Sequence, residues 1–287
     1  MDTKELQNEL IDTIGECKRI TKEAEEILNK VMDMGVYSIT TLNGIKLVSW
    51  SDGSWEDISA MLEAHYRGDI DITEYWKTGD TRTILVNDIF VDFILIGNNH
   101  DDLVNPISSS KKAAFTVQTK YCFEDKKMFD NFMTPTFSLW CDSLVRSYLN
   151  IEFKTFLPKE LQSIIKPVKK NTYRHGADRN NCKLYEGSTT THDSIFLLSE
   201  MEVYGEQSAE KSSWGRDSDG TQYEYYKDVS NRIKYPEPSY TSGTWWWLRS
   251  SYVDDCGNSA FRFVDTRGNA RYGCANHDYA IAPAFCI

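Results

Sequence analysis

The stretch TWWWLRS at residues 244–250 and the closing stretch IAPAFCI at residues 281–287 decide how this chain is organised. They bracket residues 251–280, a segment with an unusual alphabet. The segment contains no Lys, Glu, Gln, Met or Trp, although Lys and Glu are frequent throughout residues 1–250. We interpret the two apolar brackets as structural clamps and the segment between them as the part that they hold in place.

The alphabet of the segment follows a rule at the codon level. Every residue type in it can be reached from an Asn codon (AAC or AAT) by changing only the adenines. The five absent types cannot be reached in this way. A fixed frame around such a segment indicates a binding surface that is open to variation, with the rest of the chain as its support.

Composition and charge exclude several classes of protein. The chain has 287 residues, of which 40% are hydrophobic and 13% aromatic, so it is globular with ample core for one large domain or two small ones. The net charge is −11 and there is no basic block, so nucleic acid is not an expected partner. We interpret the pairs Lys111-Lys112 and Lys169-Lys170 as solvated faces. No stretch approaches eighteen apolar residues, so no membrane span is expected.

Known catalytic and cofactor motifs are missing from the sequence. We find no P-loop, G-x-G-x-x-G, G-x-S-x-G or H-E-x-x-H pattern, so we predict no enzyme activity, no cofactor and no metal. The seven cysteines have no regular spacing and no C-x-x-C pair, which argues against a disulfide framework and a zinc site. Two alternatives stay open: a Cys256–Cys274 bridge, and a nucleophile pair of Cys274 with His277.

The first thirty-five residues predict a separate element. Residues 3–33 contain no Pro and have a seam of apolar or small residues at alternating spacings of four and three, which is the pattern of a coiled coil. The seam residues are Leu10, Ile14, Cys17, Thr21, Ala24, Leu28 and Val31. We expect an oligomerising helix within residues 1–35, and the alternative is one amphipathic helix packed on its own domain.

The remainder, residues 36–287, reads as one α+β domain. Helices are predicted at residues 54–66, 137–149, 158–165 and 221–233. The second of these is expected to face inward through Trp140, Leu144, Val145 and Tyr148. Strands are predicted after a hairpin at Asn43-Gly44, at residues 83–86, 90–97, 113–119, 167–172, 194–199, 260–264 and 270–274, and at 280–285 to close the sheet.

A polar cluster follows the strongest of these strands, at residues 99–102. Its sequence is Asn99-His100-Asp101-Asp102. Histidine and carboxylates at a strand end suit metal binding or acid–base work. The simpler interpretation is a loop whose Asn and Asp side chains cap backbone groups, and we favour it.

Several motifs of the chain resemble those of a known family. The motif WWLRS at 246–250, then Gly268 and APAF at 282–285, resembles the closing motif of a domain family of unknown function found in gut bacteria and their phages. Earlier marks of the same family are residues 55–68, YW at 75–76 with GDTR at 79–82, NHDDL at 99–103 and FLLSE at 196–200. The resemblance covers the chain from about residue 40 onward.

The resemblance implies a C-type-lectin-like domain, a fold shared with the formylglycine-generating enzymes. Members of this kind are similar to the variable proteins of diversity-generating retroelements, which rewrite adenines near the end of one gene. Their best-known functional relative is a trimeric receptor binder at a phage tail tip. The implied function is therefore a ligand- or receptor-binding protein with a variable C-terminal surface, and the alternative is an enzyme or sensor on the same fold.

The expected ligand-binding residues are the polar and aromatic side chains of residues 251–280. They are Tyr252, Asp254, Asp255, Arg262, Phe263, Asp265, Arg267, Arg271, Tyr272, Asn276, His277, Asp278 and Tyr279. Strand alternation places either Phe261 and Phe263 or Arg262 and Val264 inward, and we expect part of the Phe pair to be buried. Such anchors would bind as in antibody paratopes.

The partner and location follow from the same resemblance. We expect a protein or glycan on a cell surface as the ligand and a homo-oligomer formed through residues 1–35, because an oligomer converts weak contacts into avidity. The beginning of the sequence, MDTKE, does not resemble a signal peptide. We therefore expect a virion location, on a phage tail or surface, with the bacterial cytoplasm as the alternative.

Overall fold

A computed structural model of the chain describes residues 13–23, 41–129, 139–173, 176–177, 184–185, 188–205, 219–253 and 259–287. The chain divides into two compact units, Met1–Leu47 and Val48–Ile287. The described part of the second unit combines several β-sheets with short helices, so the prediction of an α+β protein is confirmed.

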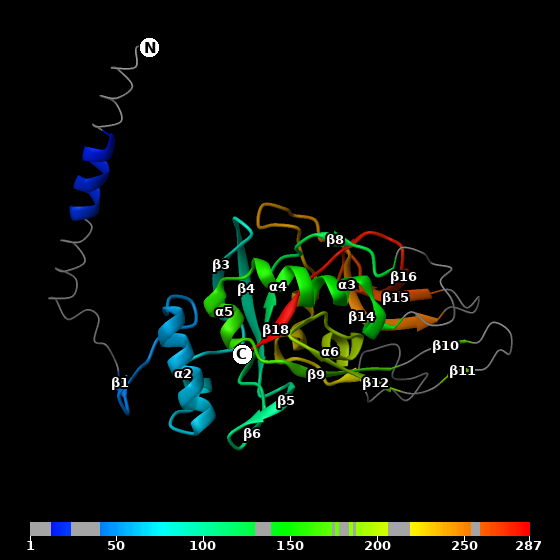
Figure 1. The fold of residues 1–287 in the computed structure, drawn as a ribbon. Coiled ribbons are helices and arrows are strands. Elements are labelled where there is room, and N and C mark those ends of the chain that lie inside the picture. The colour runs from blue at the N-terminus through cyan, green and yellow to red at the C-terminus, as the bar shows by residue number, and fades with distance from the viewer. Residues whose placement is uncertain are drawn as a thin grey trace, which may run out of the picture. The chain divides into compact units, whose positions relative to one another are not determined.

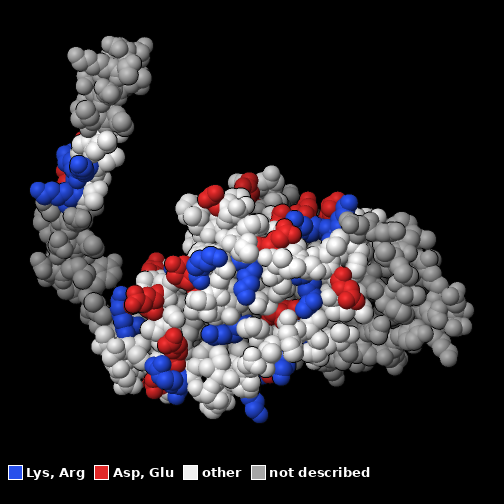
Figure 2. Space-filling view, viewed as in Figure 1, with Lys and Arg blue, Asp and Glu red and all other residues white. Residues whose placement is uncertain are grey.

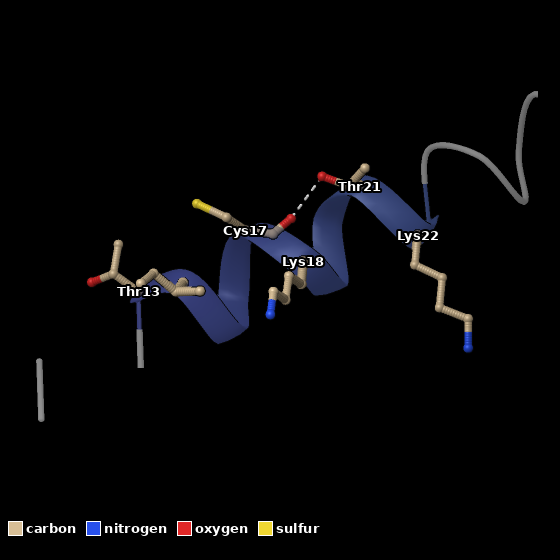
Figure 3. A pocket seen from close by; sticks show the side chains of 6 residues that line it. Thr13, Cys17, Lys18, Thr21 and Lys22 are labelled. Atoms are coloured by element: carbon tan, nitrogen blue, oxygen red, sulfur yellow. Dashed lines mark hydrogen bonds between the residues drawn. The ribbon is translucent and has the colours of Figure 1, made fainter. Parts of the chain in front are cut away.

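The first unit contains a helix and a hairpin. The helix covers residues 13–23, and every one of these side chains is exposed. A depression of about 350 Å³ runs along the helix beside Cys17 and Thr21, whose hydroxyl donates to the Cys17 carbonyl at 2.9 Å (Figure 3). The hairpin joins β1 (Thr41–Leu42) to β2 (Ile45–Lys46) through Asn43 and Gly44, both with positive φ, as the sequence predicts.

Helix α2 (Trp55–Arg67) opens the second unit and confirms the prediction for residues 54–66. The Ser54 hydroxyl accepts the Asp57 amide at its start, and Gly68 ends it with a left-handed φ of 83°. Its apolar face is buried. The Tyr66 hydroxyl donates to the Ile287 carbonyl at 3.1 Å, which fixes the helix to the closing strand.

The central sheet has five strands in the order β13-β18-β7-β4-β3. All four pairings are antiparallel. The strands are β3 (Thr81–Val86), β4 (Ile89–Asn98), β7 (Phe115–Thr119), β13 (Ile195–Phe196) and β18 (Ala284–Cys286). Every residue of β7 and β18 is buried, so this sheet forms the core of the unit.

A second sheet has the order β12-β9-β5-β6. Its strands are β5 (Asp102–Ile107), β6 (Ser110–Lys112), β9 (Val168–Tyr173) and β12 (Ser188–Asp193). A separate short pair joins β10 (Gly176–Ala177) to β11 (Leu184–Tyr185). Strand β9 confirms the prediction for residues 167–172, and it carries Lys170 into the core.

The third sheet contains the bracketed segment and has the order β16-β15-β14-β17-β8. Its strands are β8 (Asp125–Lys126), β14 (Trp246–Val253), β15 (Ser259–Val264), β16 (Ala270–Cys274) and β17 (Tyr279–Ala280). Strands β14, β15 and β16 lie at the end of the unit opposite α2 and β3 (Figure 1). The segment therefore occupies one end of the domain.

The two brackets are buried apart from Thr244 and Trp245, and Trp245 is 46% exposed. Trp246, Trp247 and Leu248 on one side, and residues 281–287 on the other, are inaccessible to solvent. One expectation about them is corrected. Residues 280–285 do not form one strand, because β17 pairs with β14 and β8 whereas β18 pairs with β7 and β13. The chain changes sheet at Pro283, which has no amide hydrogen to donate.

Two predicted helices are replaced by shorter pieces. The described part of residues 137–149 forms a 3₁₀ turn, Trp140–Asp142, then α3 (Leu144–Tyr148), and a π-helical turn, Leu149–Phe153, leads into α4 (Lys154–Phe156). Leu144, expected to face inward, is exposed. Residues 221–233 form two 3₁₀ helices, Glu224–Lys227 and Val229–Arg232, in place of one α-helix.

The other helices lie close to their predicted positions. Helix α5 (Lys159–Ile164) follows Pro158, and a 3₁₀ turn at Ile72–Glu74 follows α2. The predicted strand at 194–199 is only β13, because Ser199 caps α6 (Glu200–Tyr204) by a reciprocal bond with Glu202. Among the described residues, no helix has the length and apolar character needed to cross a bilayer.

Candidate functional site: a groove on a clamped sheet

The sheet end formed by β14, β15 and β16 is held in register by antiparallel pairing. Trp247 pairs with Phe263, and Phe263 pairs with Arg271 on the next strand. The turn from β15 to β16 is fixed by the Asp265 carboxylate, which accepts the amides of Arg267 and Asn269 at 2.9 Å each. Gly268, with φ of 82°, completes the turn, and the Tyr204 hydroxyl donates to its carbonyl at 2.8 Å.

A groove of about 410 Å³ lies over this sheet end. Its walls are aromatic rings, polar turn atoms and two guanidinium groups. The lining residues are Trp245, Phe263, Asp265, Thr266, Arg267, Arg271 and Tyr272. Five of them were predicted as ligand-binding residues from the sequence. The volume falls in the range of small-molecule binding sites.

The floor of the groove is an aromatic cluster. The Trp245 ring lies 5.8 Å from Phe263 and 5.2 Å from Tyr279, centroid to centroid, and Phe263 lies 4.7 Å from Tyr279. Beneath them Trp247 packs on Tyr279 at 4.5 Å. Trp245 is nevertheless 46% exposed. The cluster thus fixes the orientation of a ring that still presents much of its surface to solvent.

The two arginines of the groove differ in their partners. Arg271 Nε lies 3.2 Å from Asp265 Oδ2, which orients its guanidinium. Within the part of the chain that the structure describes, the Arg267 side chain makes no hydrogen bond or ion pair. Burial alone would raise the pKa of Asp265, but the amides of Asn269 and Arg267 and the other donors outweigh it and lower that pKa. Asp265 is therefore a charged anchor of the turn.

Two predicted binding residues are buried. Arg262 is 9% exposed, its Nε lies 3.1 Å from Glu200 Oε2, and its guanidinium covers the Tyr252 ring at 4.4 Å. Phe263 is 7% exposed and reaches only the floor of the groove. The sequence left open whether Phe261 and Phe263 or Arg262 and Val264 face inward. All four residues are buried, because β15 is covered on both faces.

The remaining candidates divide into four groups. Tyr252 stacks on Tyr272 at 4.2 Å, beside the groove. The ring nitrogen Nδ1 of His277 lies 2.9 Å from the Tyr279 hydroxyl at the opposite side of the cluster. Asn276 and Asp278 do not line the groove; Asp278 lies 4.0 Å from Lys127. Asp254 and Asp255 lie outside the described residues, as does Cys256, and Cys274 is a free thiol.

Trp245 is the groove residue that the sequence interpretation missed, because it was assigned to a clamp. One signal was available. In a strand, successive side chains point to opposite faces, so three consecutive tryptophans cannot all enter one core. Trp246 and Trp247 are buried because β14 is a central strand, and Trp245, just before the strand begins, is the one that remains exposed.

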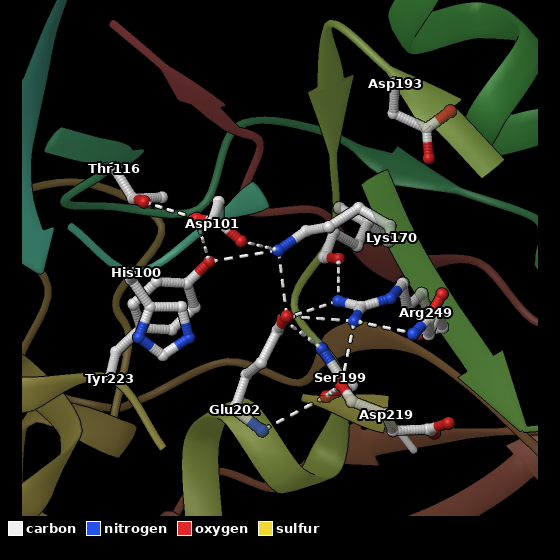
Figure 4. A network of polar contacts seen from close by, with 12 residues as sticks. His100, Asp101, Thr116, Lys170, Asp193, Ser199, Glu202, Asp219, Tyr223 and Arg249 are labelled. Atoms are coloured by element: carbon white, nitrogen blue, oxygen red, sulfur yellow. Dashed lines mark hydrogen bonds and ion pairs between the residues drawn. The ribbon is translucent and has the colours of Figure 1, made fainter. Parts of the chain in front are cut away.

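A buried ion network connects β14, which carries Arg249, to β9 and α6, which carry Lys170 and Glu202 (Figure 4). Lys170 Nζ lies 2.5 Å from Asp101 Oδ1 and 2.8 Å from Glu202 Oε1. Arg249 donates to both oxygens of Glu202, at 2.5 and 2.9 Å. All four side chains are almost completely buried. Asp101 lies in NHDDL at 99–103 and Arg249 lies in WWLRS at 246–250, and Arg249 also donates to the Leu197 carbonyl in FLLSE at 196–200. These three stretches therefore meet in the buried core.

The Asp101 carboxylate accepts hydrogen bonds from four side chains, of which Lys170 is one. It accepts hydrogen bonds from the Thr116 hydroxyl at 2.5 Å and the Tyr223 hydroxyl at 2.8 Å, and the Cys286 thiol donates to it at 3.3 Å. Burial would raise the pKa of Asp101, but the Lys170 ammonium, His100 and the hydrogen bonds from Lys170 and Thr116 together outweigh burial and hold that pKa well below its usual value. Asp101 and Lys170 therefore form a charged pair inside the core.

Two interpretations of the sequence are corrected here. Lys170 is not part of a solvated face, because it is buried against two carboxylates. The cluster at 99–102 is not simply a capping loop, since Asp101 belongs to the network while Asp102 is exposed and pairs with Lys112. Burial lowers the pKa of His100, whose ring stacks on Tyr223 at 3.9 Å.

The network lines a second, polar cavity of about 250 Å³. Atoms of His100, Asp101 and Glu202 that could bind a metal lie within 4.8 Å of one another. The Lys170 ammonium, however, contacts both carboxylates and supplies the positive charge that a metal would bring. The donor set therefore fits a metal poorly while Lys170 is protonated. Burial lowers the pKa of Lys170, but the carboxylates of Asp101 and Glu202 outweigh burial and raise that pKa.

Charged side chains of both signs lie on the visible face of the domain (Figure 2). On the face in view in Figure 2, Lys and Arg side chains are interspersed with Asp and Glu over the described part of the domain. The groove contributes a local pair of cations, Arg267 and Arg271.

Comparison with known proteins gives one match. No curated protein and no solved structure matches the chain. The model of a domain of unknown function, DUF6273, matches residues 113–287, which include β7, the network residues Lys170, Glu202 and Arg249, and the whole grooved sheet. Since this match spans more than half of the sequence, the chain belongs to the DUF6273 family.

Proposed function

We propose that this chain is a ligand-binding protein whose residues 251–280 form a surface diversified by a retroelement, on a C-type-lectin-like scaffold. One observation carries the proposal. Four of the seven exposed described residues of the restricted-alphabet segment, Thr266, Arg267, Arg271 and Tyr272, line one groove, whereas the buried ion network lies outside the segment. A surface that varies needs this separation, because substitutions in the groove then leave the scaffold intact.

The chemistry of the groove suits recognition. Trp245 and Tyr272 are each about half exposed, and rigid aromatic rings of this kind give large contact area at low entropic cost. Arg267 and Arg271 add planar donors for directional hydrogen bonds. A phage receptor-binding or otherwise displayed protein uses such a surface against a cell-surface protein or glycan.

Self-association through the N-terminal helix is part of the same proposal. Ile14, Cys17 and Thr21, three consecutive residues of the predicted seam, line one depression on the helix. Ile14 is exposed on the helix, and burying it against another chain would remove apolar surface from water. Several linked grooves would bind a repetitive cell surface with avidity.

Cell binding tests the proposal. The labelled full chain is incubated with a panel of gut bacterial strains, and bound fluorescence is measured by flow cytometry. We expect Tyr272→Ala and Trp245→Ala to reduce staining at least tenfold while circular dichroism and Tm stay unchanged. Tyr240→Ala removes an equally exposed ring (53% against 52% for Tyr272) outside the groove and should stain like the wild type. Equal staining by all the variants would contradict the proposal.

The alternative, an enzyme or sensor, would use the cavity above the ion network. His100, Asp101 and Glu202 are the observation in its favour. Because Lys170 already neutralises the two carboxylates, we favour the binding role. A thermal shift of several degrees on adding Zn²⁺, Mn²⁺ or Ca²⁺ to the full chain would support the alternative.

A further inference from the structure

The charges and aromatic rings of the groove indicate a chemical class of ligand, and this inference rests on the proposed function. The wall of the groove contains two arginines, Arg267 and Arg271, and one acid, Asp265. The Asp265 carboxylate is already hydrogen-bonded within the turn. Asp265 accepts the amides of Arg267 and Asn269, the Asn269 side chain and Arg271 Nε. The groove therefore offers positive charge, although the chain as a whole has a net charge of −11.

The donors that remain are well defined. Asp265 engages only the Nε of Arg271, so the two Nη groups of that guanidinium are left for a ligand within the described structure. The Arg267 guanidinium, at the turn, has all of its donors available among the described residues. Guanidinium groups bind carboxylates through two parallel N–H···O bonds, and they do so most strongly where an aromatic wall limits solvent.

The apolar part of the groove is a platform rather than a pocket. Trp245 is fixed by edge contact with Tyr279 and by Phe263, and Tyr272 is fixed by stacking on Tyr252. The faces of such rings are electron-rich and attract the weakly positive C–H groups of a sugar ring. A sugar that stacks on an aromatic face keeps its polar substituents at its edge, where the arginines can reach them.

We propose that the groove of this chain binds a carboxylated sugar, a uronate-type residue of a surface polysaccharide, with Trp245 as the stacking platform and Arg267 and Arg271 as the carboxylate receptors. Trp245 lies outside residues 251–280 and the arginines lie inside them. The platform is then common to all variants of the surface, and the segment selects the substituent. Replacing the arginines redirects specificity without removing sugar binding.

A matched pair of probes tests this inference. One is an immobilised oligosaccharide that ends in glucuronate, and the other is the same oligosaccharide ending in glucose, so only a carboxylate and a hydroxymethyl group differ. Binding of the full chain is measured by biolayer interferometry at 50 and 300 mM NaCl. We expect the glucuronate probe to bind at least about tenfold more tightly, since a charged hydrogen-bonded pair supplies that difference. The preference should shrink at high salt.

Variants separate the roles of the groove residues. Arg267→Gln and Arg271→Gln should bring the two affinities together, and Trp245→Ala should abolish binding to both probes. Lys227→Gln, an exposed cation that pairs with Glu224 elsewhere on the domain, is the control and should keep the preference. Folding of each variant is checked by its Tm.

Three results would overturn the inference. The first is equal affinity for the two probes. The second is a preference that survives both arginine substitutions. The third is cell staining that depends on Trp245 but is lost after protease treatment of the cells, with no binding to either sugar. The third result would identify a protein ligand, such as an acidic peptide, and would leave the proposed binding function standing. Cell staining independent of Trp245 and Tyr272 would instead contradict the proposed function itself.

Discussion

Replacing Glu202 with Gln tests the buried ion network at its centre. Glu202 receives Lys170 Nζ at 2.8 Å, two Arg249 donors at 2.5 and 2.9 Å, and the Ser199 amide at 2.9 Å. Gln has the same shape as Glu but no charge. Its NH₂ group is a donor and would face the donors of Lys170 or Arg249, to which the carboxylate of Glu202 presents an acceptor. Lys170 would keep Asp101 as its acidic partner, whereas Arg249 would lose the carboxylate with which it pairs.

The size of the effect follows from burial. Removing one partner of a buried ion pair leaves an uncompensated charge and costs about 3–5 kcal/mol. Since a domain of this size has roughly 5–15 kcal/mol of stability, the variant would lose a large share of it. At roughly 2–4 °C per kcal/mol, the expected fall in Tm is about 6–20 °C.

Urea denaturation of the wild type and variant measures the free energy of unfolding. The control is Glu224→Gln, whose carboxylate pairs with Lys227 at the surface and should contribute less than about 1 kcal/mol. The double variant Lys170→Met with Glu202→Gln should lose less than the sum of the two single variants, because the charges are coupled. A loss below about 1 kcal/mol for Glu202→Gln would refute the reasoning.

Three further predictions follow from individual contacts. Lys234 is buried with its ammonium on the Thr119 carbonyl at 2.7 Å, and burial lowers its pKa to about 8. In the unfolded chain the pKa of Lys234 is about 10.4. Between pH 8 and 10 the unfolded state therefore holds this proton more fully than the folded state, so the free energy of unfolding rises with pH. The Tm difference between wild type and Lys234→Met should shift in favour of the wild type over that range, and a constant difference would contradict this. Gly268→Ala should cost about 1–2 kcal/mol in urea denaturation, because φ is 82° and a Cβ would meet Ile233 Cγ1 at 3.2 Å; an unchanged midpoint would argue against a strained turn. Ile14→Glu should lower the mass measured by light scattering on the full chain whereas Glu16→Gln should not, and an unchanged mass for both would remove the helix as the oligomerisation element.

Local signals made parts of the fold predictable. Helix α2 has its cap at Ser54 and its stop at Gly68, and the hairpin turn has Asn43-Gly44, so each is encoded within a few residues. The 3₁₀ helices at 224–232 were predicted as one α-helix because Tyr223 and Tyr226 are three residues apart, a spacing that fits both helix types. Both rings are buried, and only tertiary packing distinguishes the two cases.

The candidate site was predictable in outline and not in detail. The alphabet of residues 251–280 led to Arg267, Arg271 and Tyr272, which share the groove. It could not show that Arg262 is buried, because the covering residue, Glu200, lies 62 positions earlier in the chain. The pairing of Asp101 with Lys170 is also long-range, so neither residue carries a local sign of it.

The central claim is that residues 251–280 form a surface rewritten at adenines on a scaffold that stays constant. Sequencing the DNA around the gene tests it most directly. We predict a nearby reverse transcriptase gene and a template repeat that differs from the coding segment at template adenines alone, with the differences falling at groove codons such as those of Arg267, Arg271 and Tyr272. A locus without a template repeat, or a repeat whose differences are spread equally over all four bases, would contradict the claim.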